Sequence, residues 1–356
     1  MDQARMERVA EQMRQQGLTQ LLVTATASVY YLTGFWVEPH ERMLALYLDT
    51  DGRAVLYGNA IFGLPSTPEL PVVTHSDGED PVASLAAAVR PGTLGIDKFW
   101  YSKFLIALMA HRPDVTPVHG SDPVDLCRKR KDAAECAAMR NSSAMNDQVV
   151  AAAISALREG VRENQLASLV NHEFLARGAD CEGTQLVCFG PNGADPHHSG
   201  DGTVLKPGDS VIFDIFTPIG RYWCDMTRTV FYRSVSTKQR EVYDLVRRAN
   251  ETAEAAIRPG ILLSELDGIA RKIITDGGYG PQFTHRLGHG CGLDCHEPPD
   301  VSGVSDAVLE PGMVFSIEPG VYLPGEFGVR IEDLVLVTET GCEVLNHYPK
   351  DLQIVE

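Results

Sequence analysis

The chain has 356 residues, of which 44% are hydrophobic and 22% charged, and its formal net charge at pH 7 is −17. This length accommodates two globular domains with separate cores. The acidic balance argues against a nucleic-acid partner, which needs a basic face, and no apolar run reaches the roughly 20 residues that a membrane-spanning helix requires. The polar N-terminus, MDQARMERVAEQMRQQG, is not typical of a signal peptide.

The eight cysteines are scattered without the spacing of a disulfide framework. Cys136 and Cys188 lie inside apolar stretches, which favours reduced thiols and therefore a cytoplasmic protein. The segment CGLDCHE, with Cys291, Cys295 and His296, raises a structural zinc site as an alternative. No second pair of ligands follows at zinc-finger spacing, which argues against that alternative.

The first part of the chain alternates between helix and strand patterns. An amphipathic helix carries Met6, Val9 and Met13, and strands are predicted at 20–24, 43–49, 54–59 and 93–97, with the turn TDGR between the second and the third. This order is typical of a compact α/β domain. The polar stretch GSDPVDLCRKRKD then leads into a long helical pattern from about Ala133 to Leu157. We therefore predict one domain at residues 1–122 and a second at 123–356.

The second domain contains an internal repeat. ALREGVRENQL (156–166) matches AIRPGILLSEL (256–266), and LKPGDSVIFD (205–214) matches LEPGMVFSIE (309–318). The two matches occur in the same order, with offsets of 100 and 104 residues. They predict a duplicated α/β unit, in which Asp214 of the first copy corresponds to Glu318 of the second.

Two aspartates interrupt apolar strands in the first copy. Buried carboxylates need a partner, because an ionised carboxylate that loses its hydration is costly. We expect the strand of Asp214 to turn between Pro218 and Ile219, which sets Asp214 opposite Trp223 and makes Asp225 its diagonal neighbour, roughly 7–8 Å away on the same face. Two carboxylates at that spacing can share a cation, although Asp214 taken alone also suits a structural ion pair.

The second copy supplies a matching pair of acids. GVRIEDLVLV (328–337) is predicted to be one strand with Arg330, Glu332 and Leu334 on one face, so that Glu332 joins Glu318. Four carboxylates together with an imidazole suit a pair of divalent ions, and such a pair can activate water and polarise a carbonyl for hydrolysis. The histidines available are His197, His285, His289 and His296, whereas His198 is expected to face solvent.

These motifs resemble the pita-bread metallopeptidases, a family that includes prolidase, aminopeptidase P, methionine aminopeptidase and the metal-free creatinase. The resemblance covers residues 130–350 through LGHG, SIEPGVY and VRIED. The first domain, with VYYLTGF, is similar to the N-terminal domain of creatinase, prolidase and aminopeptidase P. The resemblance implies an α/β (α+β) protein with a creatinase-like N-terminal α/β domain and a pita-bread domain built from a duplicated α/β unit.

The resemblance also implies a role for each matching residue. Asp225 and Glu332 are expected to bridge two divalent ions, Mn²⁺ in the first place and Co²⁺ or Zn²⁺ as alternatives, while Asp214 completes one shell and His289 and Glu318 the other. Catalytic roles fall to His197, His296 and Arg330, and substrate contacts to His285 and Tyr322. Phe216 stands where many members have glycine, which is expected to narrow the pocket.

The implied function is a dinuclear-metal exopeptidase that hydrolyses Xaa-Pro bonds, with a short proline-containing peptide as substrate and a homodimer as assembly. We expect Xaa-Pro dipeptides to be preferred; aminopeptidase P activity on longer peptides is the alternative, and a hydrolase of a non-peptide amide is another. A metal-free creatinase-like enzyme or a non-catalytic binding protein would lack ligands or histidines that are present here. A dipeptidase must bind a free carboxylate, for which Arg42 in the loop WVEPHERM is the candidate, unless that loop is merely exposed.

Overall fold

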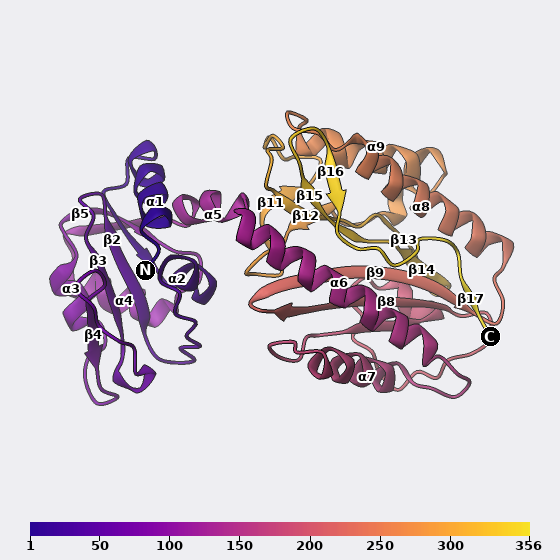
Figure 1. Ribbon diagram of the computed structural model, residues 1–356, viewed down its shortest axis with the longest axis horizontal. Helices are drawn as coiled ribbons and strands as arrows, with labels where there is room; N and C mark the ends of the chain where they lie inside the picture. Colours follow the sequence, from indigo (N-terminus) through magenta and orange to yellow (C-terminus); the bar gives the residue numbers. More distant parts are fainter. The chain divides into compact units, whose positions relative to one another are not determined.

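The computed structural model describes all 356 residues, which form two compact units, Met1–Arg128 and Lys129–Glu356. Each unit has its own buried hydrophobic core, and Figure 1 traces the chain through both from indigo to yellow. None of the helices combines the length and the apolar composition that crossing a membrane would need. The assignment of functional domains to residues 1–122 and 123–356 stays a prediction.

The first unit is built on a six-stranded mixed sheet with the strand order β4-β3-β2-β1-β5-β6. The predicted hairpin across TDGR is present, since β2 and β3 pair antiparallel on either side of it. The first helix is capped by the Asp2 side chain and buries Val9 and Met13. The elements are α1 (Gln3–Gln15), β1 (Gln20–Val23), α2 (Thr26–Thr33), β2 (Leu44–Asp49), β3 (Ala54–Asn59), β4 (Val72–His75), α3 (Ala83–Ala88), β5 (Gly92–Ile96), α4 (Ser102–His111), β6 (Val115–His119) and α5 (Asp122–Lys129).

The second unit contains a four-stranded sheet (β17-β9-β8-β7), a five-stranded sheet (β11-β10-β12-β15-β16) and the hairpin β13-β14. In Figure 1 its strands lie between α7 on one side and α8 and α9 on the other. The elements are α6 (Ala133–Ser155), α7 (Glu163–Ala176), β7 (Leu186–Phe189), β8 (Ser210–Ile219), β9 (Tyr222–Tyr232), α8 (Thr237–Ala256), α9 (Leu263–Asp276), β10 (Gly288–Gly290), β11 (Glu297–Val301), β12 (Val314–Ile317), β13 (Gly320–Leu323), β14 (Phe327–Arg330), β15 (Asp333–Val337), β16 (Cys342–Val344) and β17 (Ile354–Val355).

The duplication predicted from the sequence is present in this unit. Helices α6 and α8 both begin with a capping box, formed by Asp132 with Glu135 in the first copy and by Ser236 with Gln239 in the second. The isolated bridge between Arg162 and Val204 recurs between Leu262 and Val308, with the same offsets of 100 and 104 residues. Each copy is therefore a helical pair followed by strands, and Asp214 in β8 of the first copy corresponds to Glu318, directly after β12, in the second.

The hairpin that carries both aspartates turns later than the sequence suggested. Strand β8 continues through Pro218 and Ile219, and the chain reverses at Gly220 and Arg221, whose φ angles are 57° and 74°. Two consecutive residues with positive φ are typical of a two-residue type I′ turn, which matches the twist of the flanking strands. Asp214 consequently pairs with Thr227 and not with Trp223. Asp225 pairs with Phe216, so it remains the diagonal neighbour of Asp214 on the same face.

The segment GVRIEDLVLV is two strands and not one. β14 pairs with β13, and β15 pairs with β12 and β16, so the chain changes partners between them. Ile331 and Glu332 lie in the gap, where the backbone N–H of Glu332 donates to the carbonyl of Thr227 in β9 at 3.1 Å. The break brings Glu332 to the hairpin that carries Asp225.

Candidate active site

The second unit contains a cavity of about 280 Å³ where its two copies meet. Most of the predicted functional residues of this unit line it: Asp214, Asp225, His289, Glu318, Glu332, His197, His285, His296 and Arg330. Tyr322 is buried behind the wall and hydrogen-bonds to His285 and Arg330. Arg42 belongs to the first unit, where its guanidinium forms two hydrogen bonds of 2.9 Å with Asp77.

The imidazole of His289 is oriented toward carboxylates. Its Nδ1 lies 3.1 Å from the carbonyl of Gly290, so that nitrogen carries the proton. Its Nε2 lies 3.7 Å from Asp225 Oδ2 and 3.5 Å from Glu318 Oε1. Burial, aided by the neighbouring His296, lowers the pKa of His289 to about 3. The ring is therefore neutral, with a free lone pair on Nε2, which is the state in which histidine binds metal ions.

Three carboxylates around this imidazole resist ionisation. Burial first, and then the charges of Asp214 and Glu318, raise the pKa of Asp225 well above its usual value. Burial, with Asp225 as its strongest neighbour, does the same to the pKa of Glu332. Burial also raises the pKa of Glu318 to about 7. Acids packed together in this way repel one another unless a cation lies between them.

These side chains fit divalent cations. One ligand atom from each of Asp225, His289 and Glu332 lies within 4.8 Å of the other two. Asp214 Oδ1 is buried without a hydrogen-bond partner, although its other oxygen, Oδ2, accepts from Arg330 at 2.5 Å. A buried oxygen with no donor is costly unless something binds it. The set of carboxylate oxygens and one imidazole nitrogen is also the chemistry that divalent ions such as Mn²⁺, Co²⁺ and Zn²⁺ accept.

Arg330 connects the acids to the substrate side of the cavity. Beyond its ion pair with Asp214, it donates to Thr227 Oγ1 at 3.0 Å and to the Tyr322 hydroxyl at 2.9 Å. Burial, followed by the charge of Arg330, lowers the pKa of His285 to about 4, so the ring is neutral, and its Nδ1 donates to the carbonyl of Arg286 at 2.7 Å. Tyr322 must then donate to His285 Nε2, 2.8 Å away. This chain of hydrogen bonds fixes the orientation of the His285 ring.

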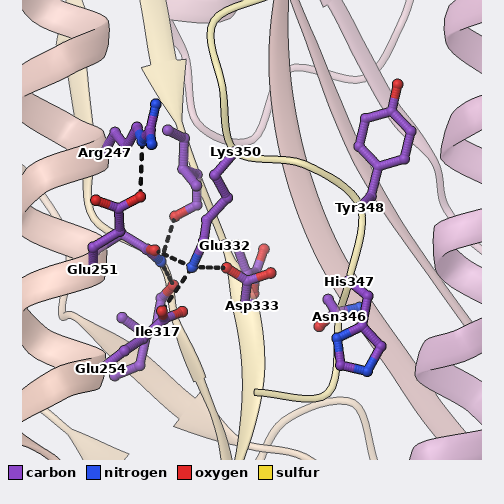
Figure 2. Close-up of polar contacts among 12 residues, drawn as sticks. Arg247, Glu251, Glu254, Ile317, Glu332, Asp333, Asn346, His347, Tyr348 and Lys350 are labelled. Atoms are coloured by element: carbon purple, nitrogen blue, oxygen red, sulfur yellow. Dashed lines mark hydrogen bonds and ion pairs between the residues drawn. The ribbon is translucent and has the colours of Figure 1, made fainter.

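The backbone around Glu332 is held by buried charges, and Figure 2 shows the part of this network in which Lys350 contacts Asp333. Arg228 donates to the Glu332 carbonyl at 2.7 Å and to Asp333 Oδ1 at 2.6 Å. Lys350, from the segment before the C-terminus, lies 3.0 Å from Asp333 Oδ2 and 2.6 Å from Glu254 in α8. The Glu332 carboxylate itself accepts from Thr227 Oγ1 at 2.7 Å. Both its main chain and its side chain are therefore oriented by β9.

Arg286 and Cys295 were not predicted to belong to this site, and His198 lies in a different environment from the one expected. Arg286 lines the cavity and forms an exposed ion pair with Asp300 at 2.6 Å; its place next to His285 was the available signal. The Cys295 thiol donates to Asp225 Oδ2 at 3.5 Å, which no pattern indicated. His198 was expected to face solvent, but it is half-buried and its Nε2 lies 3.0 Å from the buried Glu163.

Comparison with known families agrees with this arrangement. The sequence model of metallopeptidase family M24 matches residues 137–339, and that of the creatinase/prolidase N-terminal domain matches residues 5–129. The chain belongs to metallopeptidase family M24. The predicted resemblance, the creatinase-like N-terminal domain and the pita-bread domain are thereby confirmed. As an M24 member the protein is a metal-dependent peptidase, and its clustered acids and histidine support divalent metal ions as cofactors.

The similarity to individual proteins extends over nearly the whole chain. An uncharacterized peptidase of Staphylococcus aureus is 35% identical over 97% of this chain and 99% of its own length. The crystal structure of a prolidase from Thermococcus sibiricus superimposes with a TM-score of 0.93 at 32% identity, covering 99% of both chains. An X-Pro aminopeptidase from Thermotoga maritima gives a TM-score of 0.81 at 27% identity, covering 97% of this chain and 99% of its own.

Proposed function

We propose that this M24 peptidase is an exopeptidase that hydrolyses the bond before proline, and that Xaa-Pro dipeptides are its preferred substrates. The observation that carries the proposal is the buried cluster in which the free nitrogen of a neutral His289 faces the carboxylates of Asp225 and Glu318. The likeness to a prolidase over nearly the full length of both chains supports the choice of bond. Aminopeptidase P activity on longer peptides is the alternative, supported by the likeness to an X-Pro aminopeptidase.

Five side chains would hold two divalent cations. Asp225 and Glu332 would be shared between the ions, Asp214 would offer its partnerless Oδ1 to one, and His289 and Glu318 would complete the shell of the other. Cations bound there would act as Lewis acids on the scissile carbonyl and would activate water at neutral pH. The two carboxylates of each copy would contribute the four negative charges that balance two divalent ions.

The remaining polar groups of the cavity would bind and orient the substrate. His197 and His296 are exposed on the cavity wall, where each can donate a hydrogen bond to oxygen as negative charge develops in the transition state. A bond to proline has no N–H to recognise, so specificity has to come from the ring and from the free amino group. His285, fixed by Tyr322, would contact the ring, and Phe216, which lines the same cavity, would narrow it.

A dipeptide also presents a free carboxylate, which requires a cation. Arg330 is buried and already bonded to Asp214, Thr227 and Tyr322. Arg286 lines the cavity, is exposed and has one ion-pair partner, Asp300, so donors remain for a substrate carboxylate. We assign the carboxylate contact to Arg286 and keep Arg42, which pairs with Asp77 and Glu41 in the first unit, as the alternative.

Comparing an Xaa-Pro dipeptide with the corresponding Xaa-Pro-Xaa tripeptide tests this proposal. The parent protein loaded with Mn²⁺ should have the higher kcat/KM on the dipeptide. A charge-assisted hydrogen bond contributes about 1.5–3 kcal/mol, so Arg286→Ala should lower kcat/KM for the dipeptide about 10- to 150-fold and affect the tripeptide less. If only Arg42→Ala lowered kcat/KM for the dipeptide, the carboxylate contact would be assigned to Arg42. A preference for tripeptides that neither variant changes would establish aminopeptidase P activity in place of dipeptidase activity.

We further propose that the protein binds Mn²⁺, lies in the cytoplasm and forms a homodimer. The eight cysteines are all free, which supports a reducing compartment. Metal analysis of protein purified without added metal and sedimentation of the purified protein would measure the first and the third.

A further inference from the structure

A second buried carboxylate lies in this unit, away from the acids already described. Glu163, the first residue of α7, is 0% exposed. Its Oε1 accepts from the backbone N–H of Phe189 at 2.6 Å and from the Asn192 side chain at 3.0 Å. Its Oε2 accepts from the backbone N–H of Asp201 at 3.0 Å and lies 3.0 Å from His198 Nε2. All four partners belong to a single segment, residues 189–201, which we call the histidine loop.

The histidine loop borders the cavity. It leaves β7 at Phe189, and Pro196 and His197 in its middle line the cavity wall. Glu163 binds the loop near both ends, through the N–H groups of Phe189 and Asp201, and next to His197, through His198. A single carboxylate therefore restrains the loop at both ends and beside His197.

The internal duplication indicates that the scaffold does not require this acid. With the offset of 100 residues that relates Arg162 to Leu262, Glu163 corresponds to Leu263 at the start of α9. Leu263 is also 0% exposed. The second copy thus fills the same position with a hydrocarbon side chain, although a buried carboxylate is costly unless it is fully hydrogen-bonded. The carboxylate in the first copy is explained by the loop that it binds.

Glu163, His198 and Asp201 also offer one ligand atom each within 4.8 Å of one another. A metal ion there would have to displace existing bonds, because both oxygens of Glu163 already accept from backbone or side-chain donors. The hydrogen bonds of Glu163 are therefore made within the protein, where they hold the histidine loop in place.

We propose that Glu163 is a positioning residue for peptide hydrolysis, which anchors the histidine loop so that His197 can contact the substrate. The effect on catalysis rests on the proposed function. The anchoring of the histidine loop by Glu163 does not. The two consequences can be measured separately.

Amide hydrogen exchange measures the anchoring without reference to activity. In metal-loaded protein, Glu163→Leu, which installs the residue of the second copy, should accelerate exchange in peptides covering 189–201 by about 10-fold or more. Glu163→Gln keeps one acceptor oxygen and should have a smaller effect. The control Glu265→Gln, an exposed acid in the first turn of α9, should change nothing. Unchanged exchange in the loop of both Glu163 variants would overturn the proposal.

A double-mutant cycle measures whether Glu163 acts through His197. Glu163→Gln and His197→Ala should each lower kcat, by about 10²-fold for a misplaced group, with metal content unchanged. The double variant should be no more than about 3-fold slower than His197→Ala alone. If instead the two losses of kcat multiplied in the double variant, Glu163 would act independently of His197, and its proposed role through His197 would be overturned.

His198→Ala provides a second route that leaves Glu163 in place. The His198 side chain is 19% exposed, so its removal should not empty the core. It should change loop exchange and kcat in the same direction as Glu163→Gln but by less. A parent protein without any activity on Xaa-Pro peptides would refute the proposed function, whereas hydrogen exchange would still decide whether Glu163 anchors the loop.

Discussion

Two kinds of histidine face the same cavity. His289 is buried, neutral and held by the Gly290 carbonyl, so its Nε2 can act only as an acceptor or as a metal ligand. His296 lies beside it, with ring centroids 4.1 Å apart, but is exposed. Burial thus distinguishes a side chain suited to hold a cation from one suited to donate to a substrate.

Substitutions should separate these roles. Asp225→Asn and Glu332→Gln each remove a charge from the acid cluster, so both should lower the amount of bound metal together with kcat. His296→Ala should keep the metal and lower kcat by about 10²-fold or more, the usual loss for one transition-state donor. Metal analysis alongside steady-state kinetics checks this. Equal loss of metal in all three variants would mean that His296 is itself a ligand.

The sequence was sufficient to select the residues at this scale but not their partners. Asp214, Asp225, His289, Glu318 and Glu332 were selected because they interrupt apolar strands or match motifs, and all five line one cavity. The sequence did not indicate that Arg330 forms its ion pair with Asp214, 116 residues away along the chain. Partners at such separations depend on how the two copies pack, which strand patterns do not encode.

At the scale of elements, α8, β15 and the segment before the C-terminus meet around Lys350 (Figure 2). Burial opposes the ionisation of Asp333, but Arg228 and Lys350 hold its pKa below the usual value. Burial, and then the charge of Asp333, raise the pKa of Glu254 to about 7. Lys350 therefore forms ion pairs with both Asp333 and Glu254, although the pKa of Asp333 is lowered and that of Glu254 is raised.

The raised pKa of Glu254 predicts a pH-dependent stability. Between its ordinary value of 4.5 and about 7 the folded state binds more protons at this site than the unfolded state, so its contribution to the free energy of unfolding falls as pH rises through that window. The variant Glu254→Gln has no ionisable group at this site, so its free energy of unfolding does not include this fall with pH. Its stability relative to the parent should therefore improve between pH 4.5 and 7 and level off above, as urea unfolding at several pH values would measure. A difference that does not vary with pH would contradict the prediction.

Element boundaries were predictable where local chemistry sets them. The TDGR turn and the start of the long helix at Ala133 follow from turn residues and a capping box. The hairpin turn at Gly220 and Arg221 was missed because Pro218 in the preceding segment indicates a turn of its own. The break at Glu332 was missed because the apolar alternation continues through it, and only pairing with two different sheets interrupts the strand.

At the scale of the whole molecule, the acid cluster should make stability depend on metal. Burial first, and neighbouring carboxylates as well, raise the pKa values of Asp225, Glu318 and Glu332, so a bound cation removes a repulsion that the unfolded chain does not have. A ligand at about 100 times its Kd adds roughly 2.7 kcal/mol. With about 2–4 °C per kcal/mol for a domain of this size, Mn²⁺ should raise Tm by about 5–10 °C relative to chelator-treated protein. Thermal unfolding of the parent and of Asp225→Asn tests this, since the shift should be largely lost in the variant.

Duplication also determines when the centre can form during synthesis. Asp214 and Asp225 come from one copy, and His289, Glu318 and Glu332 from the other, while the backbone of Glu332 is held by Arg228, which also binds the carbonyl of Tyr348 near the C-terminus. A growing chain on the ribosome exposes the first copy long before these last residues emerge from the exit tunnel. We therefore expect newly made protein to acquire its metal only after both copies and Tyr348 have emerged from the tunnel, so that metal uptake marks the folding of the two copies together.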